Sequence, residues 1–172
     1  MKRTWSAGIA ALMTALPLAA LQEGAEKKPE PPKESRTAYI RRVYEKDRAS
    51  YGDACRAVLS LAKGEHTDAP HSQNHGELVS RGIVVESWEL EESSKLTKGT
   101  LAYMLCKALG IKGGLTMRIA GINRRYALRE AIYVGLMPKA TLGEYVAGRE
   151  LLDTITNAEI YKQEGSLDSI RK

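Results

Sequence analysis

Apolar residues between positions 37 and 161 recur every three or four residues, which is the spacing of helices that bury one face. The first such pattern covers residues 39–62 and is interrupted at Gly52, beside Asp53 as a helix start signal, so we expect two helices or one bent helix there. Residues 64–76 are polar and rich in turn-forming residues, which predicts a loop. The pattern indicates a mostly α-helical, small domain.

A helix–loop–helix pattern then occurs twice. A short apolar helix closed by Gly82 leads through a polar stretch into a longer helix over residues 97–109. Gly135 closes a second short helix, 53 positions after Gly82, and a second long helix is expected over residues 147–161. Repeated units of this kind stack on their neighbours to bury a shared core. We therefore expect two half-repeats, about residues 77–110 and 130–161.

Each half-repeat keeps part of a helix start signal. A glycine after the short helix permits the left-handed conformation that ends many helices. Thr97 can cap the next helix, but a full capping box needs Glu or Gln where Thr100 stands. In the second copy Glu150 is present while the cap position holds Ala147. Each copy thus has one half of the box.

The N-terminal segment differs from the rest of the chain. Lys2 and Arg3 precede an uncharged apolar run that ends near Ala20, which is typical of a secretory signal peptide over residues 1–20. The alternative is an uncleaved membrane anchor, but the run contains Pro17 and is shorter than the roughly 20 residues a spanning helix needs. Residues 21–36 are rich in Pro, Glu and Lys and predict a disordered linker, followed by a helical domain over residues 37–172. No later segment is apolar enough to span a membrane.

Removal of the expected signal peptide lowers the net charge of the chain. The chain carries a formal net charge of +5, and removing Lys2 and Arg3 leaves 5 − 2 = +3. Basic residues alternate with acidic ones and form no concentrated basic face, so we expect no nucleic-acid partner. We expect an exported protein that is periplasmic, associated with the cell envelope or secreted.

The chemistry-bearing side chains predict neither a metal site nor catalysis. Imidazoles and carboxylates are usual zinc ligands, but their spacing in the expected loop matches no known motif, so we expect no metal. The catalytic signatures Gly-x-Ser-x-Gly and Ser-x-x-Lys at a helix start are absent, and we expect no enzyme and no cofactor; a small periplasmic enzyme is the least favoured alternative. The residues of that loop are His66, His71 and His75 with Glu65, Asp68 and Glu77 nearby.

The two cysteines leave two alternatives open. Cys55 and Cys106 both fall on expected helices among apolar neighbours. Export places them where a disulfide can form. Cysteine also packs well as a small apolar side chain, so two free buried thiols are the other alternative.

Residues 78–109 resemble the S-layer homology module. Units of that family run as a short helix ending in Gly-Ile, a loop, and a Thr-Arg-Ala-Glu element that opens a second helix ending in Ala-Leu-Gly. Here Gly82-Ile83 and Ala108-Leu109-Gly110 match, and Thr97-Lys98-Gly99-Thr100 stands at the four-residue element. The second copy has Ala147-Gly148-Arg149-Glu150 there, and the family's leading Phe-x-Asp and Trp-Ala elements are missing. Residues 103–106 and 125–130 also resemble exported proteins without an assigned activity from bacteria with complex envelopes.

The resemblance implies a helical module that holds an exported protein to wall polysaccharide or peptidoglycan, with the Arg of the element among the ligand contacts. Lys98 is its counterpart in the first copy, and Gly148 in the second cannot serve. Because both copies lack part of the element, we favour a structural or protein-interaction scaffold of the envelope. Wall-polysaccharide binding is the alternative, and it predicts a groove lined by Lys98, Arg125, Arg129 and an aromatic residue such as Tyr126 or Trp88.

Overall fold

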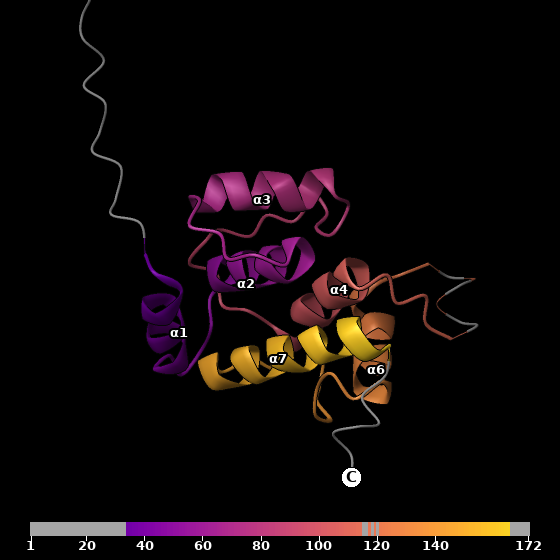
Figure 1. Ribbon diagram of the computed structural model, residues 1–172. Helices are drawn as coiled ribbons and strands as arrows, with labels where there is room; N and C mark the ends of the chain where they lie inside the picture. The colour runs from indigo at the N-terminus through magenta and orange to yellow at the C-terminus, as the bar shows by residue number, and fades with distance from the viewer. Residues whose placement is uncertain (1–33, 115–116, 118, 120, 166–172) are drawn as a thin grey trace, which may run out of the picture. The chain divides into compact units, whose positions relative to one another are not determined.

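The structure is a computed structural model that describes residues 34–165 except 115, 116, 118 and 120. The expected signal peptide, most of the expected linker and the last seven residues lie outside the described residues. The described part of the chain is helical and contains no strand, which confirms a mostly helical domain (Figure 1). Its helices are α1 Arg36–Tyr44, α2 Tyr51–Lys63, α3 His71–Ser80, α4 Lys98–Ala108, α6 Arg124–Tyr133 and α7 Gly148–Glu164.

The start of the fold includes the last residues of the expected linker. Ser35 caps α1, because its hydroxyl accepts a hydrogen bond from the Ala38 amide at 3.2 Å. The Glu34 carboxylate accepts hydrogen bonds from both Arg42 and Arg56. Residues 34–36 therefore belong to the folded domain rather than to the linker.

The break between the first two helices lies before Gly52 rather than at it. Ser50 caps α2 and accepts from the Asp53 amide, while the Asp53 carboxylate accepts from the Ser50 amide at 3.0 Å. This reciprocal capping box satisfies two amides that a helix start leaves unpaired. Gly52 consequently lies inside the first turn of α2, and Asp53 is the third residue of the helix.

The prediction of a loop over residues 64–76 is correct for residues 64–70 and wrong for the rest. Gly64 ends α2 with a left-handed φ of 79°, but α3 begins at His71. Asn74 explains the difference, because this polar residue is 2% exposed and its amide donates to the Ala69 carbonyl at 2.8 Å. A polar sequence therefore forms a helix here because one of its amides is satisfied internally, and His71 and His75 lie on a helix instead of a loop.

The two expected half-repeats have matching ends. Gly82 and Gly135 have φ values of 66° and 86°, which only glycine adopts without strain. The Ile83 amide donates to Leu78, and the Leu136 amide donates to Ala131, each at 2.9 Å. These equivalent bonds fold the chain back after α3 and after α6. At the next helix start, Thr97 caps α4 as predicted, whereas Ala147 supplies no side-chain cap to α7.

The described residues form three helix–loop–helix units: the two expected half-repeats and the helix pair that precedes them. We call α1 with α2 unit 1, α3 with α4 unit 2, and α6 with α7 unit 3. In each unit the first helix packs against the second helix of another unit: α1 on α7, α3 on α2, and α6 on α4. Figure 1 shows α3 lying along α2 and α1 beside the start of α7. Each unit thus buries its apolar face only in the presence of the others.

Three short segments that precede α2, α4 and α7 join the units in a closed hydrogen-bonded ring. The Ala49 amide donates to the Val146 carbonyl at 2.8 Å, and the Val146 amide donates to Leu96 at 3.0 Å. The Leu96 amide donates to Ala49 at 3.0 Å and closes the ring. All three residues are buried, so these bonds are shielded from water and hold the three helix starts together.

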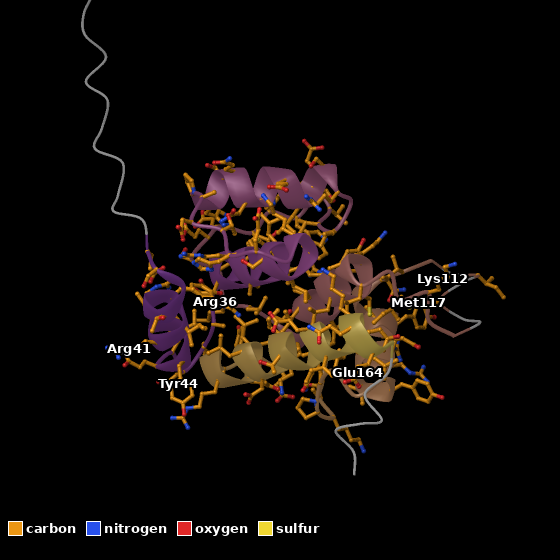
Figure 2. The ribbon with its side chains drawn as sticks, viewed as in Figure 1. Arg36, Arg41, Tyr44, Lys112, Met117 and Glu164 are labelled. Carbon is orange, nitrogen blue, oxygen red and sulfur yellow. The ribbon has the colours of Figure 1, made fainter. Side chains whose placement is uncertain are left out.

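Aliphatic side chains form most of the core around this ring. The outer face of α1 is exposed instead of buried. Its residues Arg41 and Tyr44 point away from the other helices (Figure 2). None of the described helices is long and apolar enough to cross a membrane. Fully buried core residues include Val43, Ala49, Val58, Leu59, Leu78, Leu96, Leu101, Met104, Leu105, Leu136, Val146 and Leu151.

Candidate functional site

Lys98, the expected ligand contact, lies inside the fold. It is the first residue of α4 and only 5% exposed. Its Nζ lies 2.6 Å from Glu144 Oε1 and 2.8 Å from Glu150 Oε1, both in unit 3. Burial disfavours the charged amine, but the hydrogen bonds to Glu144 and Glu150 outweigh this and raise the pKa of Lys98. Lys98 therefore remains charged, and its charge is neutralised within the protein.

The other expected polysaccharide contacts do not gather around Lys98. Arg125 and Arg129 are exposed on α6, and Tyr126 is half-buried there. Trp88 packs on Tyr103, with ring centroids 5.0 Å apart. The guanidinium that covers Trp88 is that of Arg124, at 4.3 Å from the ring centroid. No hydrogen bond, ion pair or ring contact joins Lys98 to any of these described residues. Lys98 thus has no direct contact with the other residues expected to line the groove, and Arg124, which the sequence analysis did not predict, makes the contact with Trp88.

Both cysteines are free and buried. Cys55 lies on α2 and Cys106 on α4, and burial raises the pKa of each thiol to about 12. The Cys106 Sγ donates to the Ala127 carbonyl at 3.6 Å. Such thiols are poor nucleophiles, because the reactive form is the thiolate. Of the two alternatives, the structure contains the free thiols that serve as apolar packing groups.

The histidines fall into two environments. His66 Nε2 lies 3.0 Å from an Asp68 carboxylate oxygen and 2.9 Å from the Arg56 guanidinium. His71 and His75 lie one turn apart on α3, beside the ring of Tyr51. Within the described residues, no three His, Cys, Asp or Glu side chains are grouped so that they could hold a metal ion.

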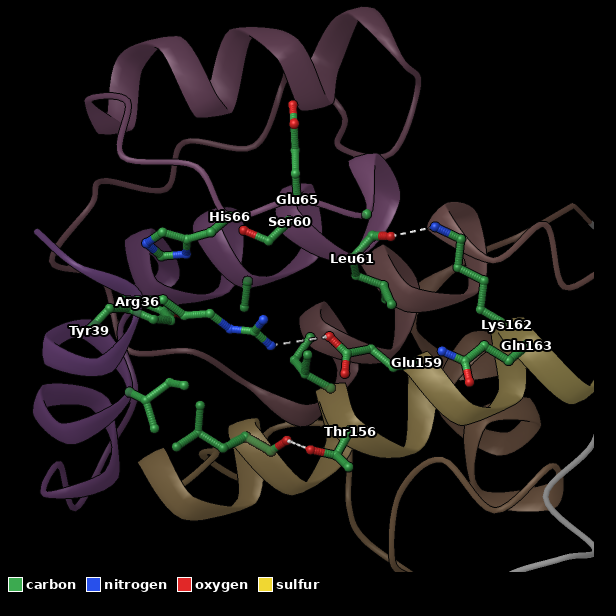
Figure 3. A pocket seen from close by; sticks show the side chains of 15 residues that line it. Arg36, Tyr39, Ser60, Leu61, Glu65, His66, Thr156, Glu159, Lys162 and Gln163 are labelled. Atoms are coloured by element: carbon green, nitrogen blue, oxygen red, sulfur yellow. Dashed lines mark hydrogen bonds and ion pairs between the residues drawn. The ribbon is translucent and has the colours of Figure 1, made fainter. Parts of the chain in front are cut away.

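A cavity of about 600 Å³ lies between α1, α2 and α7 (Figure 3). Its size is that of a pocket for a small molecule or a few side chains. One of its apolar residues, Ile40, is 39% exposed and therefore accessible from solvent. The apolar lining consists of Ile40, Ala57, Leu61, Leu152 and Ile155, with the ring of Tyr39 at one end.

Charged groups of both signs surround this apolar lining. Arg36 at the start of α1 lies 4.0 Å from Glu159 of α7, and Figure 3 shows the pair spanning the cavity. Lys162 donates to the Leu61 carbonyl at 2.6 Å, near the end of α2. The Ser60 hydroxyl donates to the Arg56 carbonyl at 2.9 Å, so Ser60 and His66 do not form a nucleophile–base pair.

A second surface combines aromatic rings with cations near the hydrogen-bonded ring. Tyr145 is 44% exposed, with Arg48 and Lys95 at 4.7 Å and 5.8 Å from its ring centroid. Tyr44 is 52% exposed, with Arg149 at 4.9 Å. We call these five residues the tyrosine–cation rim. Cations over aromatic faces are held in place by about 0.5–1 kcal/mol at exposed sites.

Comparison with known proteins adds no family to this description. No protein-family model matches the chain, and neither a curated protein nor a solved structure matches it.

Proposed function

We propose that this chain is a non-catalytic scaffold of the cell envelope that holds another envelope protein. The observation that carries the proposal is the internal pairing of Lys98 with Glu144 and Glu150. An anionic wall polymer needs an accessible cation at the start of the helix, where free amides also favour negative charge. Lys98 is instead enclosed, and two carboxylates stand in the place that such a polymer would take.

The other two units offer no replacement at the same position. Tyr51 is the first residue of α2, and Gly148 is the first residue of α7. Neither carries a positive charge. The S-layer homology resemblance places the ligand contact at these helix starts. Here the residues at the helix starts contact other units instead, which supports a role in building the scaffold.

The cavity between α1, α2 and α7 supports a protein partner. An apolar lining surrounded by charges of both signs fits a segment that inserts an aliphatic or aromatic side chain and forms ion pairs at the margin. A polysaccharide has no such apolar side chain to bury. Ile40 is the accessible apolar residue where such a segment would make contact.

Pelleting with purified cell-wall sacculi tests the role of Lys98. We would compare the wild type with Lys98→Ala and Lys98→Arg at low and moderate salt. The scaffold proposal predicts that none of the three pellets with sacculi, or that all three pellet equally. Stronger pelleting by the Arg variant together with weaker pelleting by the Ala variant would show that Lys98 contacts the wall, and the proposal would fail.

Site-specific photo-crosslinking in the native host tests the protein partner. A photoreactive residue replaces Ile40 at the cavity, and the same residue replaces exposed Gln73 on α3 as the matched control. We expect one defined protein adduct from position 40 and none of that mass from position 73. The absence of an adduct at position 40, or the same adduct at both positions, would contradict a partner in the cavity.

Wall-polysaccharide binding remains the second candidate because of the tyrosine–cation rim. Exposed tyrosine rings stacked with arginine and lysine can contact sugar rings and anionic groups together. This candidate predicts that sacculus pelleting is lost in Tyr145→Ala and falls with rising salt, whereas the Lys98 variants behave like the wild type. Pelleting that depends on Tyr145 would replace the scaffold proposal with a wall-binding one at a different surface.

A further inference from the structure

Three buried polar atoms in one small region have no hydrogen-bond partner within the described part of the chain: Tyr51 Oη, His71 Nδ1 and His75 Nε2. The Tyr51 ring centroid is 5.8 Å from that of His71 and 6.0 Å from that of His75. The Tyr51 hydroxyl lies near the Cys55 thiol but makes no hydrogen bond of good geometry with it. Buried polar groups are nearly always paired, so an unpaired group points to a bound water or ion.

The two imidazoles are arranged as a chelating pair. His71 and His75 are four positions apart on α3, so both side chains lie on one face of the helix. That face packs against α2, where Tyr51 is located. Each imidazole has a buried ring nitrogen without a hydrogen-bond partner among the described residues, and such a nitrogen is placed to bind a metal ion.

The separation of the two rings fits a shared metal ion. Metal–nitrogen bonds of about 2.0–2.1 Å place two coordinated imidazole centroids roughly 5 Å apart for a tetrahedral ion and roughly 6 Å apart for a nearly linear arrangement. The centroids of His71 and His75 are 5.8 Å apart, between these values. We propose that His71 Nδ1 and His75 Nε2 hold a divalent transition-metal ion that prefers imidazole, Zn²⁺ or Cu²⁺.

The surrounding groups favour a cation at this place. Glu92, from the connection between α3 and α4, lies near His71, and its negative charge stabilises positive charge there. The two imidazoles are the protein donors of the proposed site, and water completes the coordination. The Tyr51 hydroxyl can then hydrogen-bond to that water, which gives all three unpaired atoms a partner.

His66 provides the matched control within the same chain. Its Nε2 is already engaged with Asp68 and Arg56, at 3.0 Å and 2.9 Å. Replacing it removes one imidazole without touching the pair on α3. A metal that binds histidines on the surface without selection would be lost as readily from His66 as from the other two.

Cu²⁺ is the best probe, because it binds imidazole most tightly among these ions and has an electron paramagnetic resonance spectrum. Tag-free full-length protein is titrated with Cu²⁺ as wild type, His71→Gln, His75→Gln and His66→Gln, with circular dichroism to check the fold of each. We expect one equivalent to bind the wild type with two coupled nitrogens, and Zn²⁺ to displace it. Each α3 variant should bind at least about tenfold more weakly, and His66→Gln within about twofold of the wild type.

Three results would overturn the site. They are a wild type without stoichiometric binding, α3 variants that bind as tightly as the wild type, and a loss in His66→Gln that equals theirs. If an α3 variant does not fold, the wild-type spectrum decides by itself. Two coupled imidazole nitrogens support the site, and their absence refutes it. The outcome is independent of sacculus pelleting and crosslinking, so it does not depend on the proposed function.

Discussion

The first residues of α2 and α7 both donate backbone hydrogen bonds to another unit, but only α2 also has a side-chain cap. At α2 the Ser50 and Asp53 side chains form a capping box, while the amides of Tyr51 and Gly52 donate to the Ser94 and Glu92 carbonyls of unit 2 at 2.7 Å and 3.0 Å. At α7 Ala147 supplies no cap, and the Gly148 amide donates instead to the Lys46 carbonyl of unit 1 at 2.9 Å. The start of α2 is thus stabilised both by its own capping residues and by unit 2, whereas the start of α7 has a contact with unit 1 but no side-chain cap.

The close approach at α7 requires a glycine. A Cβ on Gly148 would lie 1.8 Å from the Val43 carbonyl oxygen and 3.0 Å from that of Lys46. Both are backbone atoms near the end of α1, and they cannot move without shifting that helix. The comparison shows that α2 combines side-chain capping with contact between units, whereas α7 has the contact without a cap, and that in both helices the contact couples distant parts of the chain.

The largest expected effect comes from closing the approach at α7. Gly148→Ala should lower the free energy of unfolding by about 3 kcal/mol, because overpacking against backbone forces a shift of α1. Urea denaturation measures the loss. A decrease below about 0.5 kcal/mol, the range of neutral surface changes, would mean that α7 does not need unit 1 at its start.

A smaller loss is expected at the start of α2. Burial raises the pKa of Asp53, but hydrogen bonds from Lys46, Ser50 and Arg42 outweigh this and lower it. Asp53→Asn should lower the free energy of unfolding at pH 7 by about 2 kcal/mol, since it removes both ion pairs from a carboxylate that is 4% exposed.

The pH dependence of Asp53 sharpens the same test. Its pKa is lower in the folded state, so its contribution is complete above the unfolded-state value of about 3.9 and is lost as the pH falls through the folded-state value. The wild type should therefore lose more stability than Asp53→Asn between pH 5 and the acid limit. Urea denaturation at each pH measures the free energy of unfolding of both proteins. If the two curves of this free energy against pH are parallel, Asp53 does not make this contribution.

An intermediate case is α4, whose first residue pairs with unit 3. Lys98→Met should cost about 1 kcal/mol, because Glu144 can turn to water while half-buried Glu150 loses its ammonium partner. Adding Glu150→Gln should recover part of the loss in thermal unfolding. If Glu150→Gln destabilises the Lys98→Met variant as much as it destabilises the wild type, the two residues are not coupled.

The smallest effect, with the opposite sign, is expected at Gly76. This glycine lies inside α3, and a Cβ there would have nothing within 4 Å. Gly76→Ala should therefore raise the free energy of unfolding by about 0.5–1 kcal/mol through helix propensity alone. It is also the matched control for Gly148→Ala. Destabilisation at Gly76 would show that glycine substitutions in this fold are harmful regardless of contact between units.

Local signals in the sequence predict the helix ends well. Gly82, Gly135 and Thr97 act within a few residues of themselves, and the structure gives each the predicted conformation or hydrogen bond. The sequence pattern does not reveal unit 1 as a similar unit, because no glycine follows α1. Its two helices are also connected by residues 45–50 alone, whereas residues 81–97 connect the helices of unit 2. A shared backbone arrangement without a shared motif leaves no periodic signal.

The sites depend on contacts that no local pattern encodes. Lys98 looks like an exposed cation until Glu144, 46 positions later, is placed beside it. The cavity brings Ile40 of α1 together with Ile155 of α7, and the pair on α3 required a helix in a segment whose polarity predicted a loop. In each case the tertiary packing decided the environment of the side chain.

Amide hydrogen exchange at Ala49, Leu96 and Val146 tests most directly whether the three units form one closed ring. We expect these three amides to open with the same free energy, close to that of global unfolding. In Gly148→Ala all three should lose protection by the same amount. If Val146 alone loses protection while Ala49 and Leu96 keep theirs, the units are stable independently and the ring does not hold the fold together.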